Sequence, residues 1–407
     1  MKFVTLTDEE FMEFVNSRPE KNFFQTTMMK ERIECDGLKV YLVGVKKGKK
    51  VIAASLIAET NHTFMGCRTY EAYKGFILDY QDEELVHFMT VEVKKFLKEK
   101  NALRLIIDPY IPNISRNAEA EIVEGVDNRH VKNFLHRLGY KDHEGAQVKW
   151  CYCLDIAGKT SEELFNDFRS STRNNINKTQ TKFLLNLKTL KRDELSEFKQ
   201  ITSDTCDRRE FQDKTLQYYE EMYDKFGKDV TFKVVELNCD TYINHLEELN
   251  KELDRKITEL SDASSNKKKK EQMKQDIDNN KKKIEEAKEL QKEKGSIIPL
   301  SGAMFMLYGD EIVYLFSGSY AEYMYFCGQY RLQWEIIKYA ADNHYRRYNF
   351  YGIQDVFNPN GKDRGVYEFK KGFGGYVEEL LGSFELSITP KNDLYRFLHK
   401  VKHIIKK

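Results

Sequence analysis

Residues 83–108 read EELVHFMTVEVKKFLKEKNALRLIID, and this stretch decides the class of the fold. Its first part carries apolar side chains at helical spacing, at Leu85, Phe88, Met89, Val93, Phe96 and Leu97. A continuous apolar run, residues 102–107, follows and ends at Asp108. Such a short run next to a turn signal is typical of a buried strand. The stretch therefore predicts a helix packed on a sheet, the unit of an α/β protein.

The same alternation of helices and strands extends to both sides of this unit. A Thr-Asp-Glu-Glu pattern that begins at Thr7 resembles a capping box and predicts a helix, and two apolar strands are predicted around a turn at 46–49. Beyond residue 149 the patterns predict strands at 150–156, 183–190, 301–308, 312–317 and 347–351, and helices after Thr160 and at 192–203 and 330–342. Two α/β units of similar size predict a duplicated fold.

The composition changes abruptly at about residue 245, and up to residue 294 Lys, Glu, Asp, Asn and Gln dominate. Apolar residues recur at spacings of three, four and seven, at Leu246, Leu249, Leu253, Ile257, Leu260, Met273, Ile277, Ile284 and Ala287. The helix-poor segment 261–266 lies midway. The pattern predicts an antiparallel helical hairpin with a self-contained apolar seam. A spacer or an oligomerisation device is an equally good interpretation of such an arm.

These patterns divide the chain as follows: a first α/β unit at 1–149, a second at 150–242 and 297–390, the arm at 243–296, and a terminal helix at 391–407. The terminal helix is predicted to be amphipathic and basic, because apolar residues at helical spacing lie opposite lysines and an arginine.

The composition excludes several classes of function. Lys and Arg together number 66 and Asp and Glu 65, so a phosphate-binding surface must be local. An acidic start without an apolar segment, and the lack of any apolar run near the roughly 20 residues of a membrane span, predict a cytoplasmic protein. Cys151 and Cys153 alternate with apolar residues in a predicted buried strand, and the histidines show no ligand spacing, so we predict free thiols and no metal.

Five segments, taken in order, are similar to the FemABX family of aminoacyltransferases: Phe24-Gln25-Thr26, residues 79–88, 107–110, 348–352 and 369–373. The predicted arm lies where that family carries a coiled-coil arm, so the resemblance covers the whole chain. It implies an α/β (α+β) fold of two GNAT-like subdomains in one globular domain. It also implies that the enzyme uses no small cofactor.

The resemblance implies transfer of Gly, Ala or Ser from aminoacyl-tRNA to the stem-peptide amine of lipid II or UDP-MurNAc-pentapeptide. An acyl-CoA-dependent N-acyltransferase is the alternative enzyme, but residues 328–331 offer one glycine where a pyrophosphate-binding turn needs several. A non-enzymatic coiled-coil protein is the other alternative. A peripheral contact with the inner face of the cell membrane and a homodimer are left open.

Aminolysis of an ester needs stabilisation of an oxyanion and an unprotonated amine, whose ordinary pKa is about 10.4. The resemblance assigns the electrostatic role to Lys370. Alternating aromatics around it predict a strand and a solvent-accessible lysine, and the glycines at 372, 374 and 375 predict a close approach of another backbone or a ligand. Asp108, at the end of a buried strand, is the second catalytic candidate, as a base.

Recognition of a diphosphate and a base or sugar needs cations and aromatic faces. Lys214 supplies a cation and Tyr218 an aromatic face, and we predict that they lie one helical turn apart, on one face of a helix. The resemblance implies an arginine at position 214. Lysine keeps the charge there but lacks the planar guanidinium that binds phosphate with two hydrogen bonds. Further substrate-binding candidates from the resemblance are Tyr314, Phe369, Lys30 and Arg32. For tRNA phosphates the candidates are Arg169, Arg173 and Lys178 in a basic helix, and Lys267 and Lys268 in the arm.

Overall fold

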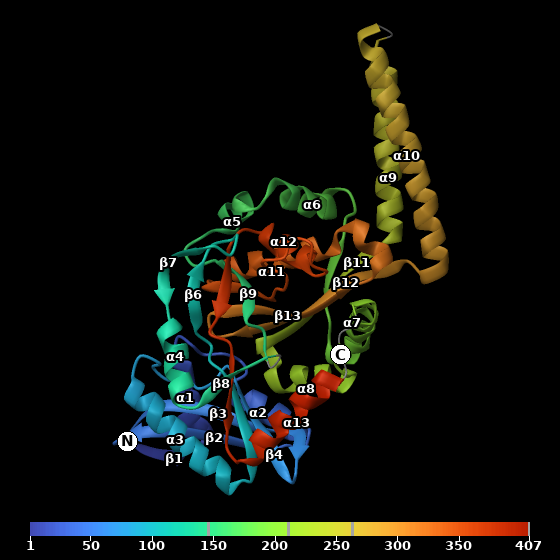
Figure 1. Ribbon diagram of the computed structural model, residues 1–407. Coiled ribbons are helices and arrows are strands. Elements are labelled where there is room, and N and C mark those ends of the chain that lie inside the picture. The colour runs from blue at the N-terminus through green and yellow to red at the C-terminus, as the bar shows by residue number, and fades with distance from the viewer. Residues whose placement is uncertain (145–146, 210–211, 262–263, 406–407) are drawn as a thin grey trace.

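The computed structural model describes residues 1–144, 147–209, 212–261 and 264–405. It consists of two β-sheets with helices packed on them, and of two long helices that project together from the second sheet (Figure 1). The expected α/β class with an inserted antiparallel hairpin is confirmed.

Seven strands form the first sheet, in the spatial order β1 (Lys2–Thr5), β2 (Val40–Lys47), β3 (Lys50–Phe64), β4 (Cys67–Tyr73), β5 (Ala102–Asp108), β16 (Ser383–Ser387) and β8 (Tyr140–His143). Its helices are α1 (Asp8–Asn16), α2 (Thr27–Cys35), α3 (Glu83–Glu99) and α4 (Arg129–Arg137). Strands β4 and β5 run parallel, and Tyr73 lies beside Asp108 at their common end. This end of the first sheet carries part of the candidate site.

Local sequence explains α1 and α3. Thr7 and Glu10 form the predicted capping box at the start of α1. The Asp82 side chain accepts a hydrogen bond from the Leu85 backbone N–H at 2.9 Å and so begins α3. The apolar stripe of α3, including Val93, is buried on the sheet. The pattern in residues 83–108 therefore predicted both the helix and strand β5 correctly.

Nine strands form the second sheet, in the order β10 (Asn186–Thr189), β11 (Val230–Asn238), β12 (Ile297–Tyr308), β13 (Glu311–Ser319), β14 (Arg347–Gly352), β9 (Trp150–Asp155), β15 (Tyr376–Leu380), β6 (Pro112–Arg116) and β7 (Ile122–Asp127). The α-helices of this unit are α5 (Ser161–Asp167), α6 (Ser170–Thr181), α7 (Leu195–Arg209), α8 (Leu216–Phe226), α11 (Gly328–Asp342) and α12 (Arg364–Lys371). Three 3-10 turns add η1 (Arg192–Glu194), η2 (Gly227–Asp229) and η3 (Ala321–Phe326).

The two units exchange strands and share a core. Strands β6 and β7 precede residue 149 but lie in the second sheet, and β16 follows it but lies in the first. A buried cluster joins Phe11 and Leu56 of the first unit to Phe198 and Phe232 of the second. Strands from both sides of residue 149 thus share each sheet. The division of the chain into subdomains at this residue stays a prediction.

The arm consists of α9 (Cys239–Glu259) and α10 (Ser264–Lys294). With 31 residues, α10 spans about 45 Å. Leu246, Ile284 and Ala287 at the base of the arm belong to the core of the second sheet. The prediction of a self-contained seam is therefore wrong at the base of the arm. There the arm helices also pack on the second sheet and bury part of its apolar surface. Part of the predicted break, residues 262–263, lies outside the described residues.

Helix α13 (Lys391–Ile405) forms most of the predicted terminal helix, and residues 406–407 lie outside the described part. Tyr395 packs against Phe64, with ring centroids 5.3 Å apart. Leu394, Phe397 and Leu398 are exposed. Among the described helices, none is both long and apolar enough to cross a membrane.

Candidate active site

Lys370 lies in helix α12, so the prediction of a strand is wrong. Tyr367 packs against Tyr152 and Phe369 against Tyr330, at centroid distances of 6.0 and 5.0 Å. The alternating aromatics reflect a helix that is covered on two sides, and not the pleat of a strand. This cover also buries Lys370, which is 5% exposed, so the prediction of a solvent-accessible lysine is wrong as well.

The Lys370 ammonium group donates a hydrogen bond from Nζ to the Gly352 carbonyl oxygen at 2.6 Å. It also lies 5.9 Å from the ring centroid of Tyr314. Burial lowers the pKa of Lys370 to about 7, while the thiols of Cys151 and Cys153 act in the opposite direction. The lysine can therefore change its protonation state near neutral pH.

The glycines after α12 bring backbone close to backbone, as the sequence indicated. A Cβ on Gly375 would lie 2.1 Å from the Cys153 carbonyl oxygen, and this glycine has φ +98°. A Cβ on Gly372 would lie 2.4 Å from the Thr172 hydroxyl. Glycine is therefore required where α12 turns into β15 beside β9.

Asp108 is buried at the end of β5, where Lys74 follows the parallel strand β4. The Lys74 ammonium lies 2.8 Å from Oδ2, and the Lys74 backbone N–H donates to Oδ1 at 2.8 Å. Burial raises the pKa of Asp108 even though both contacts with Lys74 lower it. Sequence reasoning missed Lys74, because it lies 34 residues from Asp108 and no local pattern links the two.

The two catalytic candidates approach a common buried point. Burial raises the pKa of Cys151 on β9 to about 12, and the ammonium groups of Lys74 and Lys370 both act to lower it. Both lysines therefore lie near this thiol, Lys74 from the end of β4 and Lys370 from helix α12. Tyr351 lies near the same point. Burial raises the pKa of its hydroxyl, and Cys151 and Asp108 raise it further.

A buried polar network that the sequence did not reveal links the two sheets. Arg347 pairs with Glu311 at 2.7 Å and with Glu378, both on strands of the second sheet. Its guanidinium donates to the Tyr110 hydroxyl at 2.9 Å, and the Tyr110 ring lies 5.6 Å from the Lys74 ammonium. The network therefore holds the part of the site around Lys74 and Tyr110 against the second sheet. Both carboxyl groups contact the one buried guanidinium, so the arginine is paired on two sides.

Arg32, Lys214 and Tyr218 form a cluster between α2 and α8. The Arg32 guanidinium carbon lies 4.6 Å, and the Lys214 ammonium 5.1 Å, from the ring centroid of Tyr218. Lys214 precedes α8, so the predicted shared helical face is wrong, but the two side chains do meet. Burial lowers the pKa of Lys214, and the Arg32 guanidinium lowers it further. Lys30 is apart from this cluster and pairs with Asp8 at 2.8 Å.

A hollow of about 480 Å³, open to solvent, adjoins this cluster. Arg32, Asp36, Glu59, Glu71 and Tyr73 contribute its polar lining, and apolar side chains of α2, β3 and the segments just before α2 and β2 complete it. Burial raises the pKa of Glu71. A cation, carboxyl groups and aromatic rings thus border one opening on the first unit, next to the cluster at Tyr218.

The remaining substrate candidates lie around Lys370. Tyr314 on β13 is buried and its hydroxyl donates to Gln329 Oε1 at 2.9 Å. Phe369 packs edge-on against Phe373 at 5.4 Å, besides its contact with Tyr330. Phe369 therefore covers one side of helix α12, which carries Lys370.

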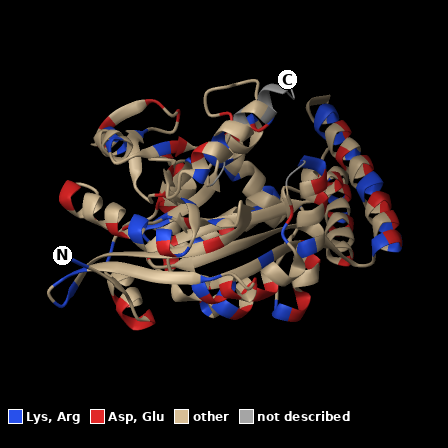
Figure 2. Ribbon diagram, turned by 60° about the horizontal axis from the view of Figure 1, so that its bottom comes forward, with Lys and Arg blue, Asp and Glu red and all other residues tan. Residues whose placement is uncertain are grey.

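The tRNA candidates fall into two places. Arg169 lies 3.3 Å from Glu368, Arg173 donates to the Asn166 carbonyl, and Lys178 contacts Asn175, all along α6. Lys267 and Lys268 are exposed near the far end of the arm. Figure 2 shows Lys and Arg mixed with Asp and Glu along both arm helices, so the arm has no face of one charge in this view.

The chain matches the model of the FemAB family over residues 6–400. Aminoacyltransferase FemA of Staphylococcus epidermidis is 31% identical over 418 residues, covering 99% of this chain and 100% of the relative. Aminoacyltransferase FemA of Staphylococcus aureus strain MRSA252 is 31% identical over 417 residues, covering 99% of each. The crystal structure of FemX is 22% identical, with a TM-score of 0.74, and covers 98% of this chain and 99% of that one.

The fold of two joined α/β units, the inserted arm and these relatives define an aminoacyltransferase. The chain belongs to the FemAB family. The resemblance inferred from the sequence is thereby confirmed.

Proposed function

We propose that this enzyme transfers glycine, alanine or serine from aminoacyl-tRNA to the stem-peptide amine of a peptidoglycan precursor, either lipid II or UDP-MurNAc-pentapeptide. The observation that carries the proposal is the buried Lys370, a lysine with a pKa of about 7, in an aminoacyltransferase of the FemAB family. The cluster of Arg32, Lys214 and Tyr218 supports it, because it offers two cations and an aromatic face to a diphosphate and its base or sugar.

In the proposed reaction the acceptor amine forms a bond to the ester carbonyl carbon. The tetrahedral oxyanion collapses, the carbon–oxygen bond to the ribose breaks, and the ribose oxygen leaves and takes up a proton. The Lys370 ammonium stabilises the oxyanion or the departing oxygen in a site with little water. Asp108 accepts the proton of the amine, because its raised pKa makes its carboxylate a stronger base.

The test combines purified enzyme, tRNAs charged with different amino acids, and either lipid II or UDP-MurNAc-pentapeptide, with product masses read by mass spectrometry. We expect the precursor to gain the mass of one amino acid residue with at least one charged tRNA. Acetyl-CoA in place of the charged tRNA is the matched control. Acylation from acetyl-CoA, with none from any charged tRNA, would overturn the proposal.

Asp108→Asn tests the assigned base, because it keeps the shape and the acceptor oxygen next to Lys74. We expect the transfer rate to fall by about 10²-fold or more, the usual scale for loss of a general base. An Asp108→Asn enzyme with near-normal turnover would leave Asp108 a structural partner of Lys74 only.

A further inference from the structure

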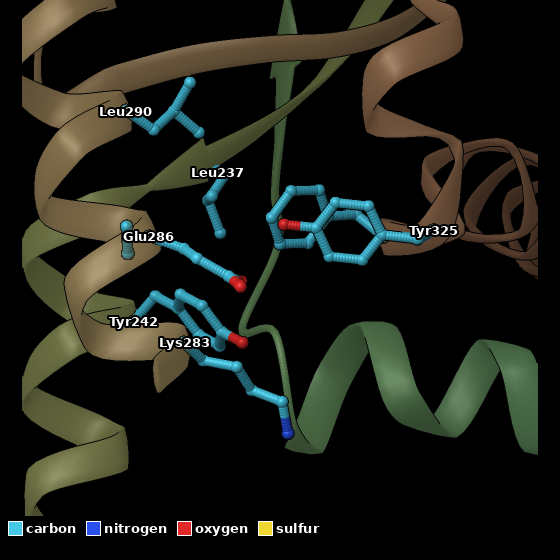
Figure 3. A pocket seen from close by; sticks show the side chains of 8 residues that line it. Leu237, Tyr242, Lys283, Glu286, Leu290 and Tyr325 are labelled. Carbon is cyan, nitrogen blue, oxygen red and sulfur yellow. The ribbon is translucent and has the colours of Figure 1, made fainter. Parts of the chain in front are cut away.

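A second hollow lies at the base of the arm, far along the chain from the cluster around Tyr218. It is shallow and open to solvent, and its polar lining comes from Tyr242 of α9, Lys283 and Glu286 of α10, and Tyr325 of η3. Figure 3 shows the Tyr325 hydroxyl and the Glu286 carboxylate pointing toward each other across it. None of the functions considered so far uses these residues.

Tyr325 presents an aromatic surface to solvent. It is 59% exposed, although a tyrosine ring this large is usually covered. Its ring is supported from behind by Phe326, with centroids 4.0 Å apart, and Phe326 is itself buried and packs on Phe183. A rigid exposed ring of this kind is a platform on which a nucleobase can stack.

Lysines lie beside this ring: Lys283 lines the hollow, and the Lys182 ammonium lies 5.4 Å from the ring centroid of Phe183, which packs against Tyr325 at 6.3 Å. Burial lowers the pKa of Lys182, and the ammonium groups of Lys283 and Lys178 lower it further, so the three charges lie close together. Lys178 and Lys182 also act on the thiol of Cys327, two residues after Tyr325. In Figure 3 the Lys283 ammonium points toward the end of the helix that leads into Lys182. An anion between these cations would offset their mutual repulsion.

Glu286 makes the hollow more specific than a patch of lysines. Burial raises the pKa of Tyr242 to about 12, and the Glu286 carboxylate acts in the same direction, so the carboxylate lies close to this hydroxyl. A carboxylate accepts hydrogen bonds from the exocyclic amine of cytosine, and uracil has no such amine.

The surface leads from this hollow to the candidate active site. Residues 169–182 contain four cations and no Asp or Glu, and helix α6 within them packs against α11. Tyr330, in the first turn of α11, contacts Phe369 next to Lys370. Helices α6 and α11 thus connect the arm base with the helix that carries Lys370.

We propose that the hollow at the base of the arm binds the single-stranded 3′ end of the tRNA, with a cytosine on Tyr325, its amine at Glu286, and the adjacent phosphates at Lys182 and Lys283. This inference rests on the proposed function. The terminal adenosine carries the ester, so the stacked base belongs to one of the two cytosines that precede it.

The test measures binding of fluorescent single-stranded RNA that ends in CCA, against the same RNA ending in UUA, by anisotropy at low and physiological salt. Wild-type enzyme should prefer CCA. Lys182→Glu with Lys283→Glu should weaken binding of both RNAs at least ten-fold, and Tyr325→Ala at least five-fold. Glu286→Met should remove the preference for CCA. Lys251→Glu, on the exposed surface of α9, is the control for a reversed charge elsewhere on the arm and should change nothing.

Transfer from a 3′-aminoacyl-adenosine donor, which lacks the upstream nucleotides, should be equal in wild type and in all these variants. Variants that bind and use tRNA like the wild type, or a wild type without preference for CCA, overturn the inference but leave the proposed function standing. A wild type that transfers from no charged tRNA removes the proposed function itself.

Discussion

Each of the two α/β units buries a lysine near the same point, and the two lysines differ in their partners. Lys74, at the end of β4, is 2% exposed and forms an ion pair with Asp108. Lys370, in α12, is 5% exposed, and its hydrogen bond goes to a carbonyl oxygen. The first charge is neutralised by the protein itself. The second is left to be compensated by whatever charge develops in the site.

This difference assigns different tasks to one residue type. A buried ion pair is costly to break, because the remaining charge has no partner. A buried lysine without a carboxylate already costs stability, so its presence points to a use in the reaction. The comparison can be tested by removing each charge separately.

The largest expected effect is on stability, from Lys74→Met. This change leaves the Asp108 carboxylate buried without its cation, and breaking such a pair costs about 3–5 kcal/mol. Urea denaturation should show this loss. The double variant Lys74→Met with Asp108→Leu removes both charges and should recover most of it. A single variant within about 1 kcal/mol of wild type would contradict the assignment of Lys74 as the necessary partner.

The next effect is on the reaction, from Lys370→Met. The apolar stem stays and the charge is lost, so the transfer rate should fall by about 10²-fold or more, as when a preorganised oxyanion donor is removed. The melting temperature should rise, because a buried charge is replaced by an apolar group. The transfer assay and a thermal melt measure the two effects.

Lys371→Met is the matched control for Lys370. The Lys371 ammonium lies 2.8 Å from Glu119, whose side chain is 53% exposed, so this pair contributes at most about 1 kcal/mol. We expect its rate to stay within two-fold or so. A Lys371→Met enzyme that is inactive, beside an active Lys370→Met enzyme, would reverse the assignment.

A smaller effect is the pH dependence of the stability gain in Lys370→Met. The pKa of Lys370 is about 7 in the folded protein and 10.5 as the ordinary value. Between these values the unfolded chain binds a proton that the folded protein does not, so wild-type stability rises with pH in this window. The difference in stability between Lys370→Met and the wild type should therefore shrink from pH 7 to pH 10. A constant difference in melting temperature across this range would show that Lys370 does not titrate there.

The smallest expected effect is in the cluster at Tyr218. Lys214→Arg supplies a planar fork for a diphosphate and should lower the KM for the precursor a few-fold while kcat stays unchanged. Lys30→Ala should leave the KM nearly constant, because Lys30 pairs with Asp8 away from the cluster. If Lys30→Ala raises the KM more than Lys214→Ala does, the precursor site lies along α2 instead.

Some of the candidate site could be predicted from the sequence. Asp108 follows an apolar run, and the glycines after Lys371 mark a close approach, because both features are local. The burial of Lys370 and the partner of Asp108 could not be predicted in this way. They depend on β14 and on β4, which lie 18 and 34 residues from them in the sequence.

The sequence by itself determined the α/β class, the capping boxes, helix α3 with strand β5, and the existence of the arm. Hydrophobic periodicity and side-chain caps act over a few residues, so these features are written locally. Only the tertiary structure decided that β6, β7 and β16 cross between the sheets, that Lys74 closes on Asp108, and that Tyr325 meets Glu286 at the base of the arm. Each of these features depends on contacts between segments that are distant in the sequence. The burial of the side chains and the pairing of their charges arise only when those segments pack together.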